Sequence, residues 1–94
     1  MYYLISDATA RKLKEKHRVE EHEVVECFQN RTRHTLIDDR EEHKTHPSTQ
    51  WFIAETDAGR RLKVVFIQIS RTEYVIRTAY SPDEIEEKMY ERNT

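Results

Sequence analysis

The chain has 94 residues and a mass of 11.4 kDa, which suits a single domain, because most domains contain about 100 to 150 residues. Hydrophobic and charged residues each make up 36% of the sequence, so we expect a modest core under a heavily charged surface. The net charge of −2 excludes a histone-like, globally basic protein. Any nucleic-acid role must therefore depend on a local basic patch.

Cysteine content and hydropathy indicate the cellular compartment in which we expect the protein. Cys27 is the one cysteine, which excludes an internal disulfide and a metal site built from several thiolates. Apolar runs such as Val64 to Ile67 have only a few residues, far fewer than the roughly 20 that span a bilayer. The sequence does not open with a secretory signal pattern. We therefore expect a cytoplasmic protein with no membrane partner.

The first third of the chain predicts two helices. Between Asp7 and His17 the apolar residues recur at helical spacing, and Asp7 is placed to act as the N-cap. The pattern resumes from Glu20 to Asn30, where Val24 and Phe28 share a face and several glutamates suit a helix N-terminus.

The middle of the chain predicts strands. Thr35 to Asp38 is a short candidate strand, and residues 39 to 48 are almost without apolar content, which predicts an exposed loop. Three hairpin-linked strands rich in β-branched and aromatic residues follow, at Gln50 to Thr56, Arg61 to Ile69 and Glu73 to Ala79.

The end of the chain predicts a short helix. Pro82 lies at its first turn, acidic residues follow, and Ile85 and Met89 are four positions apart. The predicted fold is therefore α+β, with two N-terminal helices, a mainly antiparallel sheet of three to four strands and a short C-terminal helix in one domain, residues 1 to 94.

Positive charge concentrates between residues 60 and 80. Five cations oppose Glu73 there, a local charge of +4; they are Arg60, Arg61, Lys63, Arg71 and Arg77. Lys63 and Arg77 fall at interior strand positions, where a rigid pair of cations suits phosphate recognition. The alternative is that both lie on a solvent face and pair with Glu55 and Glu73 across the sheet.

The predicted C-terminal helix carries the opposite charge. Between residues 83 and 91, five acidic residues oppose Lys88, which gives −4. Such a helix gains from docking near the basic strands, or is displaced from them by a ligand. A solvated helix face is the other interpretation.

The histidines and the cysteine carry weaker signals. His43 and His46 lie near Asp38 and Asp39, which could describe a metal-dependent hydrolase, an acid/base pair or exposed loop histidines. Because a His-x-x-His pattern without cysteine or a helical HExxH frame is common by chance, we assign no metal and no cofactor. We interpret His17 as an interior or helix-terminal histidine, and Cys27 as a small core residue. With one glycine the chain cannot build a P-loop or a nucleophile elbow.

Several segments resemble the BrnT toxins, small RelE-superfamily ribonucleases of bacterial toxin–antitoxin pairs. The segment Leu13 to Val19, with the following Glu23, Val24 and Phe28, is similar to the opening of that family. Gly59 to Phe66 resembles its Gly-Arg-x-Leu-x-Val-Val strand, and Ile76 to Ala79 resembles its Ile-Arg followed by Ser-Ala. The family's N-terminal Phe-x-Trp-Asp is absent, and Tyr80 stands where the family usually has arginine, which keeps a hydrogen-bonding group but loses its charge.

The resemblance implies a RelE-like fold with helices packed on one side of a curved sheet, metal-independent RNA cleavage, and a partner antitoxin. Cleavage through attack by a 2′-hydroxyl needs a base, cations near phosphorus and an acid for the leaving oxygen. We assign the cations to Arg61, Lys63 and Arg77, the acid to Tyr80 or a loop histidine, and the base to Glu55 or His43. The RNA-binding set comprises Arg60, Arg61, Lys63, Arg71 and Arg77. The alternative is a non-catalytic module of the same fold that binds a protein or RNA.

Overall fold

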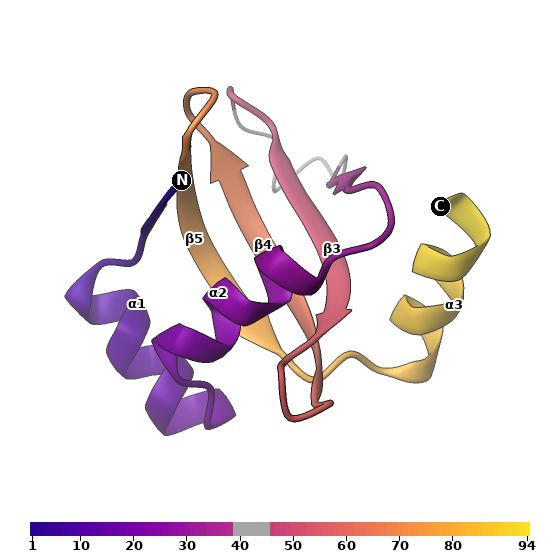
Figure 1. Cartoon of the computed structure of the whole chain (residues 1–94), viewed down its shortest axis with the longest axis horizontal. Helices are drawn as coiled ribbons and strands as arrows, with labels where there is room; N and C mark the ends of the chain where they lie inside the picture. The colour runs from indigo at the N-terminus through magenta and orange to yellow at the C-terminus, as the bar shows by residue number, and fades with distance from the viewer. Residues whose placement is uncertain (39–45) are drawn as a thin grey trace.

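The computed structural model describes residues 1–38 and 46–94 (Figure 1). The elements in chain order are β1 (Tyr2–Leu4), α1 (Asp7–Lys12), the π-helical segment η1 (Leu13–His17), α2 (Glu21–Asn30), β2 (Leu36–Ile37), β3 (Thr49–Glu55), β4 (Arg61–Gln68), β5 (Glu73–Tyr80) and α3 (Glu84–Asn93). The α+β class, the two N-terminal helical regions and the C-terminal helix are confirmed.

The sheet has five strands in the order β1-β5-β4-β3-β2, so the prediction of three to four strands is wrong. The missed strand is β1, which pairs in parallel with β5, whereas the other neighbours are antiparallel. Three residues are too few to show an alternating pattern, so β1 carries no strand signal of its own. It is held by its backbone pairing and by Tyr3, whose ring stacks on Tyr74 with centroids 5.8 Å apart.

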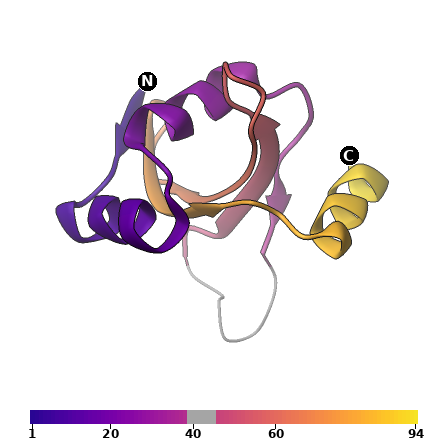
Figure 2. The same cartoon turned by 90° about the horizontal axis from the view of Figure 1, so that it is seen from below.

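The core lies between α2 and one face of the sheet. Alternate residues of β4, namely Leu62, Val64 and Phe66, have exposed fractions of 0 to 2% because period-2 alternation directs them to the same face. From α2, Phe28 reaches Phe52 and Phe66 edge-on, with centroids 4.9 and 5.2 Å apart. Figure 2 shows the sheet curving around the core, with α2 across its open side.

Cys27 belongs to this core, as predicted. Its side chain is fully buried, and its thiol donates to the carbonyl oxygen of Ala54 at 3.6 Å. Burial, with smaller contributions from nearby carboxylates, raises the pKa of Cys27 to about 12. The residue is therefore a thiol at neutral pH, and it packs as a small apolar group.

The opposite face of the sheet, which bears Lys63, Val65 and Tyr80, is called the outer face below. Lys63 is the register partner of Tyr80 in the β4–β5 pair. The segment η1 packs against β5, and α3 packs against β3. In Figure 2, α1 and α3 lie at opposite sides of the sheet, in indigo and yellow. Tyr80, next to η1, and Lys63, next to α3, therefore lie on the part of the sheet between these helical regions.

Candidate functional site

Lys63 is the centre of a polar cluster on the outer face. Its side chain is 11% exposed, and its Nζ donates to Oε2 of Glu86 from α3 at 2.6 Å. The same nitrogen lies 4.5 Å from the ring centroid of Trp51 and 5.6 Å from that of Tyr80. An ammonium over aromatic faces is attracted by their negative charge density. Lys63 is thus held in one position by two rings and one carboxylate.

Tyr80 and Glu86 complete the cluster. The Tyr80 hydroxyl donates to the same Oε2 of Glu86 at 2.9 Å. Burial, then the hydrogen bond to Glu86, raises the pKa of Tyr80, so the phenol stays protonated at neutral pH. Burial acts to raise the pKa of Glu86, but hydrogen bonds from Lys63, the Asp83 backbone N–H and Tyr80 outweigh it and lower that pKa. The carboxylate is therefore ionised at neutral pH.

His17 lies next to this cluster at the end of η1. Its ring centroid is 5.5 Å from that of Tyr80, with the ring planes tilted by 36°. Burial, and then the charges of Lys16 and Lys12, lower the pKa of His17. The imidazole is consequently neutral at neutral pH and can accept a proton. The helix-terminal position is confirmed, whereas the proximity to Tyr80 has no signal in the sequence.

A groove gives access to the cluster from the side of β2. It has a volume of about 400 Å³ and lies between β2, β3 and α3, with Lys63 and Glu86 among its lining residues. Ile37 and Met89 line it as well and are 64% and 49% exposed. The spacing of Ile85 and Met89 predicts the C-terminal helix, and the helix forms, but the buried residue of α3 is Tyr90.

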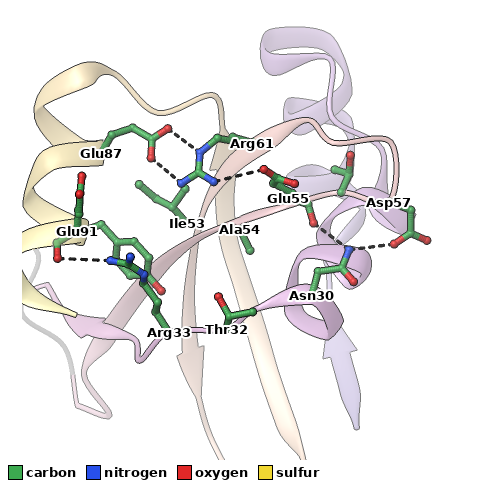
Figure 3. A pocket seen from close by; sticks show the side chains of 12 residues that line it. Asn30, Thr32, Arg33, Ile53, Ala54, Glu55, Asp57, Arg61, Glu87 and Glu91 are labelled. Carbon is green, nitrogen blue, oxygen red and sulfur yellow. Dashed lines mark hydrogen bonds and ion pairs between the residues drawn. The ribbon is translucent and has the colours of Figure 1, made fainter.

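A larger pocket of about 600 Å³ lies on the other side of α3 (Figure 3). In it Arg61 binds Glu87 through two N–H···O hydrogen bonds of 2.7 Å and lies 3.6 Å from a carboxylate oxygen of Glu55. The charged lining comprises Arg33, Arg61, Glu55, Asp57, Glu87 and Glu91. Four carboxylates against two guanidinium groups make this pocket a poor receptor for phosphate.

Arg60, one of the predicted RNA-binding cations, has an internal role. Its guanidinium donates to the carbonyl oxygens of Arg18 and His17 at 2.7 and 3.0 Å, and lies 3.3 Å from Glu23. Those carbonyls end η1, where Arg18 adopts a left-handed conformation with φ of 55°. Arg60 therefore caps the helical segment and ties it to α2.

Arg77 and Arg71 remain exposed. Arg77 has no register partner, because Val65 pairs with Thr78 while Phe66 pairs with Ile76, which makes Arg77 the extra residue of a β-bulge. Arg71 lies in the turn between β4 and β5. Within residues 1–38 and 46–94, neither side chain forms an ion pair.

The structure thus brings together two of the five predicted catalytic residues, Lys63 and Tyr80. Glu55 is held beside Arg61, Arg77 lies in the bulge, and His43 falls outside the described residues, as does Asp39 of the alternative metal site. Lys63 pairs with α3, so the alternative pairing of Lys63 with a strand glutamate is wrong. Of the two interpretations of the acidic helix, the Lys63–Glu86 and Arg61–Glu87 pairs support docking against the basic strands and not a wholly solvated face.

Comparison with models of known protein families finds no match, and comparison with curated proteins finds none either. Across the described part of the chain, no helix combines the length and apolar character needed to cross a membrane. Among the same residues, no group of three or more histidine, cysteine, aspartate or glutamate side chains is placed to hold a metal ion.

Proposed function

We propose that this protein is a RelE/BrnT-like endoribonuclease that cleaves RNA without a metal, neutralised by a partner antitoxin as the family resemblance implies. The observation that carries the proposal is the juxtaposition of an ammonium, a protonated phenol and a neutral imidazole at Lys63, Tyr80 and His17. Cation, acid and base are the three groups that cleavage through a 2′-hydroxyl requires.

The proposed reaction assigns each group one role. His17 accepts the proton of the 2′-hydroxyl as that oxygen attacks phosphorus. Lys63 stabilises the negative charge that develops on the phosphoryl oxygens. Tyr80 donates its proton to the departing 5′-oxygen, so that the products are a 2′,3′-cyclic phosphate and a free 5′-hydroxyl. Glu86 is a positioning residue, because the same carboxylate oxygen, Oε2, accepts hydrogen bonds from both Lys63 and Tyr80.

The test is inducible expression in a bacterial host with growth and total RNA integrity followed together. We expect wild type to arrest growth and degrade RNA, and Tyr80→Phe to relieve both, since phenylalanine keeps the ring and removes the proton donor. Tyr74→Phe on the same strand is the matched control, because Tyr74 packs in the aromatic core. Arg77→Ala tests whether the exposed bulge cation contributes. Intact RNA with normal growth in wild type would overturn the proposal.

A second candidate is the non-catalytic binding module. It is favoured by one observation: Arg60, Arg61 and Lys63 are each neutralised by an internal carboxylate. Cations whose charge is already balanced in this way stabilise less well the negative charge that develops on the phosphoryl oxygens. RNA bound in a salt-dependent way but recovered intact would favour this candidate over the enzyme.

A further inference from the structure

A cluster of exposed cations lies in α1, in η1 and at Arg18, which follows η1 directly. Five cations oppose Glu15 between residues 11 and 18, a local charge of +4; they are Arg11, Lys12, Lys14, Lys16 and Arg18. We call them the cationic face. All five are exposed, and across residues 1–38 and 46–94 none of their side chains forms an ion pair.

This face contrasts with the strand cations. Arg60, Arg61 and Lys63 have their charge balanced by Glu23, Glu87 and Glu86. A polyanion gains little from cations that already have carboxylate partners, whereas unpaired surface cations release counterions when they meet phosphates. The cationic face is therefore the stronger attractor for a polyanion, although the strands carry a similar formal charge.

The position of the cationic face indicates where a bound polyanion would run. The segment η1 packs against β5, and His17 at its end approaches the Tyr80 ring at 5.5 Å between centroids. Exposed Arg77 belongs to the same strand. A chain of phosphates held by α1 and η1 would thus pass the His17–Tyr80–Lys63 cluster.

We infer that α1 and η1 form a phosphate-binding track for single-stranded RNA, which feeds the RNA toward Tyr80. The identity of the polyanion rests on the proposed function. An anionic membrane surface is the other class of polyanion, but helices that lie on membranes insert large apolar residues. In α1 and η1 the large apolar side chain, Leu13, is buried, and none of the exposed large hydrophobic residues belongs to these elements.

The experiment measures binding without cleavage. The probe is fluorescein-labelled 2′-O-methyl oligouridine, which lacks the attacking hydroxyl, so the full wild-type chain can be used; anisotropy is recorded over a series of salt concentrations. The test variant is Arg11→Gln with Lys14→Gln. The control, Lys88→Gln with Arg92→Gln, makes the same substitutions in the exposed part of α3 and produces the same net charge. Glutamine and these cations have similar helix propensities, and circular dichroism checks the fold.

We expect the test variant to bind about 20-fold more weakly at about 0.1 M salt, and the slope of log K against log salt to fall by about 1.4, because each phosphate contact contributes about 0.7. The control should bind like wild type. Equal losses in both variants, or binding to anionic vesicles but not to the oligonucleotide, would overturn the inference.

Cleavage of an ordinary oligouridine is assayed separately, so that the two proposals fail in different ways. If the test variant loses binding and wild type shows no cleavage, the proposed phosphate-binding track is supported and the proposed nuclease activity is overturned. If wild type cleaves RNA and the test variant binds as tightly as wild type, the proposed nuclease activity is supported and the proposed track is overturned.

Discussion

Arg61 of β4 and Glu87 of α3 are joined by two hydrogen bonds of 2.7 Å, one from Nε and one from Nη2. The preceding residue of the helix, Glu86, pairs with Lys63 of the same strand. The helix α3 is thus attached to the sheet by two neighbouring ion pairs and by one buried aromatic residue, Tyr90, whose hydroxyl donates to the His34 carbonyl at 2.8 Å. Its attachment should respond to pH and to single charge changes.

We expect Glu87→Gln to lower the free energy of unfolding by about 0.5 to 1 kcal/mol at neutral pH, the range for a well-formed but partly exposed pair. The hydrogen bonds from Arg61 lower the pKa of Glu87. Stability from this pair is therefore full above the unfolded carboxyl pKa, and it is lost as the pH falls through the lower folded value. Urea unfolding at several pH values should show a smaller difference between the variant and wild type in acid.

Glu84→Gln is the control for this prediction. Glu84 is 81% exposed and pairs with Lys88 on the same helix, so its loss should cost less. A difference between Glu87→Gln and wild type that stays constant down to strongly acid pH would contradict the assigned pair.

The Lys63–Glu86 pair predicts unequal costs for its two partners. Glu86→Gln leaves a mostly buried ammonium between two rings without its carboxylate, which we expect to cost about 2 kcal/mol or more. Lys63→Met replaces the ammonium by an apolar chain that fits the same aromatic slot, so it should cost less. A double-mutant cycle followed by thermal or urea unfolding measures the change in the free energy of unfolding for each substitution. A larger decrease for Lys63→Met than for Glu86→Gln would show that the pair is not desolvated.

The helices with a helical apolar period and the strands rich in β-branched and aromatic residues were predictable from the sequence. Val64 and Phe66 alternate with polar or half-buried neighbours, and β4 is the middle strand of the sheet. The short strand β1 was not predictable, because its three residues gain their order from pairing with β5. Ile85 and Met89 indicated a helix correctly, but their spacing could not show that a glutamate on the same helix faces the sheet.

Only part of the site was predictable from the sequence, because charges that are close in the sequence are balanced by carboxylates from distant elements. The +4 between residues 60 and 80 pointed to strand cations, three of which are paired with carboxylates from other elements. The cationic face of α1 and η1 is followed closely by Glu20, Glu21 and Glu23. When net charge is summed over a longer stretch of sequence, these glutamates cancel most of the positive charge. In space Glu23 pairs with Arg60 instead.

Cys27 should resist alkylation in the native protein. Its side chain is fully buried, and its pKa is raised to about 12, so very little reactive thiolate exists at neutral pH. Mass spectrometry after iodoacetamide treatment should show slow labelling under native conditions and fast labelling in denaturant. Equally fast labelling in both would contradict the position of Cys27 in the core.

The pH dependence of RNA cleavage should be broad, since the two proposed proton-transfer groups are shifted apart. His17 must be neutral to act as the base, and its pKa is lowered from 6.5, so activity should persist below that pH before it declines. Tyr80 must be protonated to act as the acid, and its pKa is raised from 10.0, so the alkaline decline should begin above that value. The measurement is the initial rate of oligouridine cleavage across pH, with His17→Gln as the variant that removes the acid limb. An acid limb that survives in His17→Gln would assign the base to another residue.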